Sequence, residues 1–266
     1  MTTNYIQLKG ISGCGKGSRV STLMLFLQSK FKYEPYNVEI KIHGVMNKIT
    51  VGIYFPDLNT VFTGKWVKSN KSKLYSWTGL DWFNSAMGGW SIKEMLIKSK
   101  AHNIIVEGYP MTLSGMYRAE AVLNEYGYDR ALFQYFDYDN LEQVQGRMME
   151  RSGKRIKGTC WGTNKGFMKE GQDQLKEMAQ RGVDKLYVEL HKFDAPITVF
   201  GEMFFKEVIK DPTLLDEFLE FTKTTTSMRH VSRLAENHQQ FQHLIDEQKR
   251  TYVRTTITTS TDCILS

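Results

Sequence analysis

The first thirty residues of the chain pass from one hydrophobic pattern to another. Tyr5–Leu8 alternates apolar and polar positions, which predicts a strand. Four glycines then fall within residues 10–17, which predicts a loop. Lys16–Ser29 has the period of a helix, with apolar residues at Val20, Leu23, Met24 and Leu27. A strand, a glycine-rich loop and a helix in this order begin an α/β nucleotide-binding fold.

Later runs predict the other strands and one hairpin. Short apolar runs predict strands at Asn37–Ile42, Asn103–Val106, Arg130–Phe136 and Pro196–Phe200. Two further β-like runs, Lys48–Phe55 and Thr60–Val67, flank the turn Pro56–Asn59 and predict a hairpin. Helices normally connect the strands of a parallel sheet. We therefore interpret this hairpin as an insertion beside a substrate site.

Helical stretches complete the predicted architecture. They are expected at Asp81–Lys100, Ser114–Tyr126, Asn140–Arg151, Gly166–His191, Pro212–Thr222 and about Met228–Lys249. The predicted fold class is α/β, a parallel sheet of the P-loop NTPase type with flanking helices, the hairpin insertion near 48–67 and extra C-terminal helices. We expect a kinase core at 1–205, with a substrate-site insertion at about 43–90 and a lid-like loop at about 147–166. A C-terminal helical extension would follow at 206–266.

Composition narrows the class of protein. The 266 residues are 41% hydrophobic and 24% charged, as in ordinary globular proteins. No run of 18 apolar residues and no signal-like N-terminus occur, so neither a membrane partner nor secretion is expected. Cys14, Cys160 and Cys263 are too few and scattered for a disulfide framework or zinc site. The cytoplasm is the expected compartment, that of the host if the protein is viral, and the oligomeric state stays open.

Charge is distributed unevenly along the chain. The net charge is +6, but residues 1–100 carry 14 Lys/Arg against 5 Asp/Glu, and residues 101–150 carry 3 against 8. Residues 151–200 are basic again. The two basic regions flank the predicted active site and suit a polyanionic ligand, although any ATP site needs some local positive charge.

The glycine-rich loop carries the strongest chemical signal. Its sequence, GISGCGKGS, matches GxxxxGK with a glycine next and a serine one position later. Glycines allow several backbone N–H groups to point at one phosphate, and the following helix adds its N-terminal dipole. Lys16 would neutralise the β/γ oxygens of ATP, and Ser18 is the candidate hydroxyl on the Mg²⁺ side. The predicted nucleotide-binding residues are Gly10, Ser12, Gly13, Cys14, Gly15, Lys16, Gly17 and Ser18.

This loop resembles that of adenylate kinase and related nucleoside monophosphate kinases. Two later stretches resemble the same family, Val106–Pro110 at a strand end and Arg147–Arg155 at the entry to its lid. The resemblance implies a role in holding Mg²⁺ for Glu107, although a carboxylate there can also cap a turn. It implies that Arg147, Arg151 and Arg155 clamp the transferring phosphoryl group, although arginines on a solvated helix face are an alternative.

The chain also departs from that family. Its phosphate-loop proline is Ser12 here, and Met111 replaces the arginine that grips an acceptor phosphate. The acidic residues that usually follow the lid arginines give way to a basic and aromatic loop at residues 156–165. These differences put a phosphate acceptor in doubt and favour another acceptor chemistry.

The segment 64–90 suggests what that acceptor is. Lysines there interleave with four of the five tryptophans of the chain. Lysines can meet phosphates while aromatic rings stack on an exposed base, as nucleic-acid binding requires, although the tryptophans can instead pack the core. The predicted acceptor-binding residues are Lys65, Trp66, Lys68, Trp77, Trp82 and Trp161.

An alcohol acceptor would benefit from a general base. Asp81 is the first candidate and Asp57 the second, although Asp81 can equally cap the helix that begins there. In general character the chain resembles bacteriophage P-loop kinases that phosphorylate 5-hydroxymethyluracil within DNA, a step toward hypermodified thymidine. That resemblance implies ATP and Mg²⁺ as cofactors and DNA as partner. A kinase of free nucleosides or nucleoside monophosphates is the alternative, and an ATP-binding module that acts by binding DNA or a partner is a third.

Overall fold

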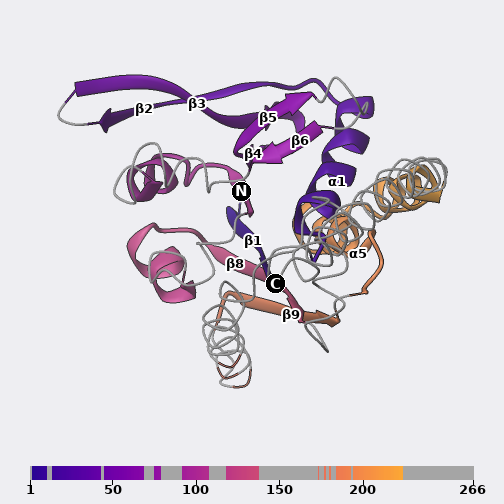
Figure 1. The fold of residues 1–266 in the computed structure, drawn as a ribbon. Helices are drawn as coiled ribbons and strands as arrows, with labels where there is room; N and C mark the ends of the chain where they lie inside the picture. The colour runs from indigo at the N-terminus through magenta and orange to yellow at the C-terminus, as the bar shows by residue number, and fades with distance from the viewer. Residues whose placement is uncertain are drawn as a thin grey trace, which may run out of the picture.

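A seven-stranded sheet forms the centre of the molecule (Figure 1). The structure, a computed structural model, describes residues 2–10, 14–42, 45–68, 75–78, 92–107, 118–137, 173, 177, 180, 184–192 and 194–223. The strand order is β2-β3-β4-β7-β1-β8-β9. Five strands are parallel: β4 (Thr60–Thr63), β7 (Asn103–Glu107), β1 (Asn4–Gly10), β8 (Arg130–Asp137) and β9 (Leu186–Lys192). The sheet confirms the predicted α/β class.

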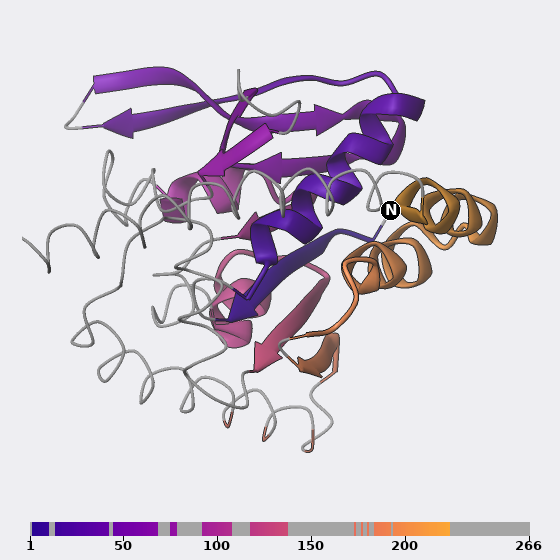
Figure 2. The same cartoon turned by 45° about the vertical axis from the view of Figure 1, so that its right-hand side comes forward.

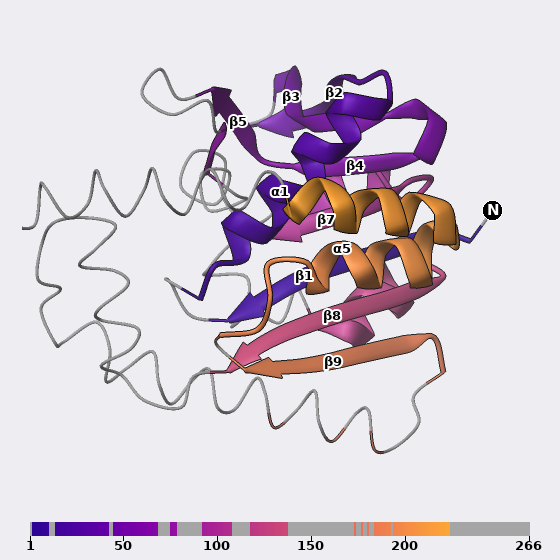
Figure 3. The ribbon, with the colours of Figure 1, turned by 90° about the vertical axis from the view of Figure 1, so that its right-hand side faces the viewer.

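Helices cover both faces of this sheet. α1 (Lys16–Lys30) lies on one face with α5 (Val199–Met203), which continues as the π-helical segment Phe204–Ile209 (Figures 1 and 3). The helical segments 92–98 and 119–125 lie on the other face (Figure 1). They are joined there by the hydroxyl of Tyr128, which donates to the carbonyl of Leu96 at 3.0 Å. Three layers therefore bury the parallel strands, and all seven residues of β1 are buried.

Aromatic packing fixes the α1 face. Phe26 of α1 contacts Phe205, Phe218 and Phe221, with ring centroids 5.5–5.7 Å apart. Gly201 lets α5 approach this cluster, because a Cβ there would lie 2.1 Å from the Phe218 ring. The helix at 212–223, which the sequence predicts, is thereby tied to α1 and α5 (Figure 3). The division of the chain at residue 205 stays a proposal.

The predicted hairpin is confirmed, and it is part of a larger antiparallel extension. β3 (Val45–Phe55) pairs with β4 on one side and with β2 (Glu34–Ile42) on the other. The turn Pro56–Leu58 joins β3 to β4, and β4 then also pairs in parallel with β7. The second half of the hairpin is thus a core strand. It ends at Gly64, whose φ of 125° breaks the predicted run Thr60–Val67 in two.

Two predictions near the end of the core are wrong. The expected helix Gly166–His191 includes β9, whose residues Leu186–Lys192 pair with β8. The alternation in LYVELHK is a strand pattern that the preceding helical period obscured. The expected strand Pro196–Phe200 is instead a turn leading into α5, which begins at Val199. Phe200 is buried within helix α5, and hydrophobicity alone does not distinguish such burial from strand pairing.

Several predicted elements lie outside the described residues. These are the helix at Asn140–Arg151, the lid-like loop at 147–166, the start of the helix at Asp81–Lys100 and the helix at Met228–Lys249. Within the described residues, no helix is long and apolar enough to cross a membrane.

Candidate active site

The carboxyl ends of the parallel strands bring the predicted nucleotide-binding residues to one edge of the sheet. β1 ends at Gly10, β7 at Glu107 and β8 at Asp137. The connection that leaves β1 leads through α1 to β2 at one edge of the sheet, whereas β8 is followed by β9 at the other edge. Adjacent strands whose connections diverge open a crevice at their carboxyl ends, where α/β proteins bind ligands.

Two glycines are required by the path of the phosphate loop. Gly10 has a φ of 141°, and a Cβ there would lie 2.9 Å from the carbonyl oxygen of Phe136. Gly15 has a φ of 80° and precedes the first residue of α1, where a Cβ would lie 2.8 Å from Nη1 of Arg19. Both positions therefore disfavour a side chain, Gly15 because of its left-handed φ and Gly10 also because of the Phe136 backbone. They are the two glycines of the GxxxxGK pattern, at the two ends of the predicted loop.

Lys16 lies at the start of α1 and folds back over the loop. Its Nζ donates to the carbonyl oxygen of Gly10 at 2.6 Å and lies 3.6 Å from Sγ of Cys14. The side chain is buried. The first turn of α1 contains no acidic residue, so the positive end of the helix dipole and a lysine ammonium coincide. An anion is the ligand that this end of the helix favours.

Arg19 is a residue of this site that the sequence reasoning missed. Its guanidinium donates to the carbonyl oxygens of Cys14 at 2.6 Å and Pro196 at 3.2 Å, and also to that of Ala195. The same group lies 4.2 Å from the ring centroid of Phe136. It thereby joins the phosphate loop to the β9–α5 connection. An arginine in the first turn of a helix, where the dipole disfavours it, is the signal that could have marked it.

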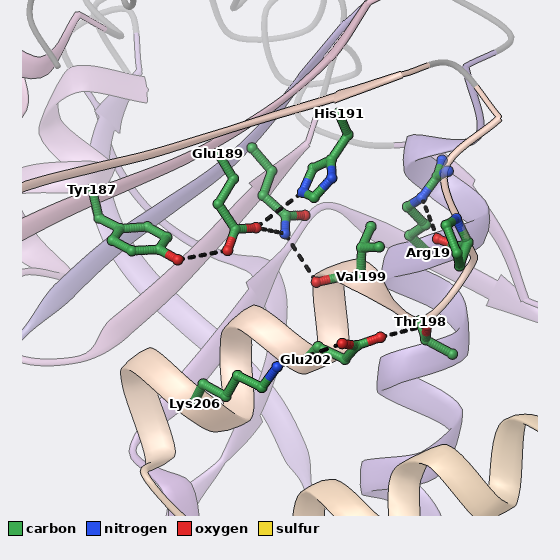
Figure 4. A network of polar contacts seen from close by, with 10 residues as sticks. Arg19, Tyr187, Glu189, His191, Thr198, Val199, Glu202 and Lys206 are labelled. Carbon is green, nitrogen blue, oxygen red and sulfur yellow. Dashed lines mark hydrogen bonds and ion pairs between the residues drawn. The ribbon is translucent and has the colours of Figure 1, made fainter. Parts of the chain in front are cut away.

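A network of polar contacts centred on Glu189 of β9 lies next to the Arg19 contacts (Figure 4). Glu189 accepts hydrogen bonds from Tyr187 at 2.6 Å, from Gln134 at 2.6 Å and from His191 at 3.0 Å. Burial opposes ionisation of Glu189, but these donors lower the pKa of its carboxyl below the usual value. The ring of His191 stacks on Phe136 at 5.4 Å, so the network reaches the ring that Arg19 covers.

Lys9 is a buried cation directly before the loop. Its Nζ lies 4.6 Å from the ring centroid of Phe133. Burial, and then the charge of Arg118, lower the pKa of Lys9 to about 7. The ammonium thus lies on the face of β1 opposite to α1 and loses its charge near neutral pH.

Oxygen donors at this edge suit Mg²⁺. Ser18 lies in the first turn of α1, and Glu107 is the last residue of β7, a partner of Leu8 in the sheet. Mg²⁺ typically takes one or two carboxylates together with substrate phosphates. One carboxylate and one hydroxyl beside a phosphate loop fit that preference. The described residues contain no cluster of three or more His, Cys, Asp or Glu that would suit a metal held by protein alone.

The predicted acceptor segment includes a separate two-stranded ribbon. β5 (Lys65–Lys68) and β6 (Tyr75–Thr78) pair in antiparallel fashion, with Trp66 opposite Trp77. The two tryptophans are therefore cross-strand neighbours in the backbone register of the ribbon. The ribbon follows Gly64 at the carboxyl end of β4, on the side of the phosphate loop. The backbone thus places Lys65, Trp66, Lys68 and Trp77 in one module.

The other predicted site residues lie outside the described residues. They are Ser12, Gly13, Asp81, Trp82, Arg147, Arg151, Arg155 and Trp161. Their roles stay predictions.

Similarity to known proteins identifies the family. A family model described as 5-hmdU DNA kinase 2 matches residues 2–190, from the start of β1 into β9. The chain belongs to the 5-hmdU DNA kinase 2 family. A protein of Salmonella phage ViI that is named 5-hmdU DNA kinase 2 is 32% identical over 180 residues. The match covers 66% of this chain and 58% of the phage protein. The family match thus includes the phosphate loop, the hairpin and the ribbon, but not α5 or the helix at 212–223.

Proposed function

We propose that the chain is an ATP-dependent P-loop kinase that phosphorylates the hydroxymethyl group of 5-hydroxymethyluracil in DNA. The observation that carries the proposal is the phosphate loop, with two obligatory glycines and Lys16 at the N-terminus of α1, in a chain of the 5-hmdU DNA kinase 2 family. The named activity of the phage relative supplies the substrate. The product would be a step toward hypermodified thymidine in the cytoplasm of an infected host.

Each predicted residue has a place in this reaction. The hydroxymethyl oxygen attacks the γ-phosphorus, the bond from that phosphorus to the β–γ bridging oxygen breaks, and ADP leaves. Lys16 would turn from the Gly10 carbonyl to the β/γ oxygens, and Arg147, Arg151 and Arg155 would neutralise charge on the transferred group. Asp81 would accept the hydroxyl proton. Mg²⁺, held through Ser18 and Glu107, would offset phosphate charge.

The target base must leave the helical stack before its hydroxymethyl group can reach ATP. Trp66 and Trp77 on the β5–β6 ribbon, with Trp82 and Trp161, would stack on the extruded base or its neighbours. Lys65 and Lys68 would contact the adjoining phosphates. The ribbon lies at the same edge as the phosphate loop, which this transfer requires.

Transfer of labelled γ-phosphate from ATP to a panel of acceptors tests the proposal. The panel would contain unmodified DNA, the same DNA with 5-hydroxymethyluracil, and free nucleosides and nucleoside monophosphates. Label on the hydroxymethylated DNA alone is the expected result. Label on a mononucleotide alone would instead establish a kinase of free nucleotides, and tight ATP binding without transfer would establish a binding module.

A further inference from the structure

The part of the β2–β3 hairpin that extends beyond the core has no role in the proposed reaction. Residues 37–42 and 45–50, here called the hairpin arm, form the distal half of the hairpin. β4 pairs with β3 only over Gly52–Phe55, so residues 45–51 continue past the carboxyl end of β4. At about 3.3 Å per residue, that is a projection of roughly 20 Å. In Figure 2 the end of β2 and the start of β3 lie on the side to which the arrowheads of β1 and β8 point.

A β-bulge marks the base of the arm. Tyr36 pairs with Gly52 and Asn37 with Thr50, so Val51 is the extra residue on β3. Bulges bend a strand and change the direction of the residues beyond them. The carbonyl oxygen of Val51 accepts a hydrogen bond from the backbone N–H of Gly64 at 2.9 Å. Gly64 is the residue between β4 and β5, so this bond continues the β3–β4 pairing and places the base of the arm next to the start of the ribbon that carries Trp66 and Trp77.

One face of the arm is supported by the protein, and the tip is not. Val38 and Ile40 are buried. The segment 92–98 lies beneath them, where Glu94 accepts from the backbone N–H of Lys41 at 3.3 Å and Lys98 donates to the Glu39 carbonyl. Near the turn, Val45 is 64% exposed and Met46 is 55% exposed, two of the five exposed large hydrophobic residues of the described chain.

The exposed face of the arm carries positive charge. Cross-strand register places Lys41 opposite Met46 and Lys48 opposite Glu39, all on the face that does not contain Ile40. Lys41 and Lys48 are exposed, and neither forms a salt bridge among the described residues. An apolar tip flanked by lysines on a projecting β-hairpin has the chemistry of a DNA groove contact, with lysines on phosphates and an apolar wedge against base edges.

We propose that the hairpin arm binds duplex DNA beside the target base and that Val45 and Met46 enter a groove there, helping to unstack the base that the ribbon then receives. This rests on the proposed function, because it assigns a DNA surface to that same site. Duplex DNA is the occupant that the arm favours for three reasons. The arm reaches past the phosphate loop edge, the residue at its base, Val51, is hydrogen-bonded to Gly64 next to the ribbon, and its exposed lysines complement a polyanion.

Equilibrium binding of the full chain to a fluorescent 30-base-pair duplex that contains 5-hydroxymethyluracil tests the inference. The double variant Lys41→Gln/Lys48→Gln should weaken binding about tenfold at low salt and lower the slope of log affinity against log salt by about 2. The matched control is Lys32→Gln/Lys100→Gln, which removes two exposed lysines near the amino ends of the strands. It should change affinity by less than about twofold. Equal effects of the two variants would overturn the proposal.

The wedge is tested separately with Val45→Ser/Met46→Ser. The fluorescence of a 2-aminopurine placed next to the target base increases when that base is unstacked. We expect the Val45→Ser/Met46→Ser variant to lose most of this increase on binding, while the Lys32→Gln/Lys100→Gln control retains it. Unchanged fluorescence in the variant would contradict the wedge. If the wild-type chain elutes as a dimer on size exclusion and the variant as a monomer, Val45 and Met46 would instead contact a second copy of the chain.

Phosphorylation of a short single-stranded acceptor separates the two proposals. The arm variants should keep wild-type turnover on an eight-nucleotide single strand that contains 5-hydroxymethyluracil, because it has no duplex groove and its base needs no extrusion from a duplex. If no variant or wild-type protein phosphorylates that strand or the duplex, the proposed function fails. If all do, and duplex affinity is also unchanged in the arm variants, only the arm inference fails.

Discussion

The donor side and the acceptor side of this molecule are built differently. At the phosphate loop, buried groups determine one another's positions. The backbone of Phe136 leaves no room for a side chain at Gly10, and Lys16 donates a hydrogen bond to the Gly10 carbonyl. Arg19 hydrogen-bonds both Cys14 and the β9–α5 connection. On the acceptor side, the hairpin arm and the β5–β6 ribbon project from β3 and β4, and a hydrogen bond from Gly64 to Val51 holds their bases side by side. Closely packed residues suit the binding of one small donor, the proposed ATP. Strands that project from the core suit the binding of a long acceptor, the proposed DNA.

The largest expected effect is on the donor side, with Lys16→Ala. Loss of the ammonium at the β/γ oxygens should reduce phosphoryl transfer by at least about 10³-fold, as expected when one cationic partner of the transferring group is removed. Transfer of γ-phosphate in a single turnover measures it. The exposed Lys32→Ala is the control and should retain activity. Full activity in Lys16→Ala would exclude the P-loop assignment.

The next effect belongs to the acceptor side. Asp81→Asn should lower turnover by roughly 10²–10⁴-fold if this carboxylate takes the hydroxyl proton. The same single-turnover assay on hydroxymethylated DNA measures it, with ATP affinity as an internal control that should not change. A decrease of less than about threefold would remove Asp81 from the catalytic residues and leave it as a helix cap.

Arg19 tests how rigid the donor side must be. Arg19→Met should reduce turnover by about 10- to 100-fold, because a loop displaced by about 1 Å loses that much. It should also lower the free energy of unfolding by about 1–3 kcal/mol, since the carbonyls of Cys14, Ala195 and Pro196 lose a donor. Kinetics and urea unfolding report the two effects. Arg19→Lys keeps the positive charge but not the planar set of guanidinium N–H donors. Wild-type turnover and stability in Arg19→Lys would therefore contradict this explanation.

Trp66→Ala measures stacking on the ribbon. Stacking on one base is worth about 1–3 kcal/mol, so KM for the DNA acceptor should rise about five- to tenfold or more, with kcat for bound substrate less affected. Tyr33→Ala, which truncates an exposed aromatic at the start of β2, should leave KM unchanged. An unchanged KM in Trp66→Ala would assign this tryptophan to packing.

The smallest effect on activity is expected at Lys9, where stability is the readout. The pKa is about 7 in the folded chain and 10.5 in the unfolded chain, so the unfolded state binds more protons between these values. Stability should therefore rise with pH from about 7 to 9.5, by at most about 1.4 kcal/mol per pH unit, and the slope should vanish below pH 7. Urea unfolding of wild type and Lys9→Met across this range tests it, and a persisting slope in Lys9→Met would contradict the assignment.

Much of the donor side could be predicted because its signal is local. Consecutive residues specify the strand, the glycine turn and the helix, and the structure confirms β1 and α1 within two residues of the expected bounds at each end. The end of the core could not be predicted in the same way. β9 is a strand because β8 leaves an edge for Leu186–Lys192 to pair with, whereas Phe200 is buried in the core as part of helix α5.

The sequence by itself determined the α/β class, and it predicts the chemistry that we propose, from a glycine-rich loop at residues 10–18 and a basic aromatic segment near residues 64–90. Only the tertiary structure decided which distant residues meet. Arg19 contacts Ala195 and Pro196 across more than 170 residues, and Val51 accepts from the backbone N–H of Gly64 because β4 pairs alongside β3. Local patterns report how a segment buries its own apolar side chains. Contacts between segments depend on strand order and register, which no local period encodes.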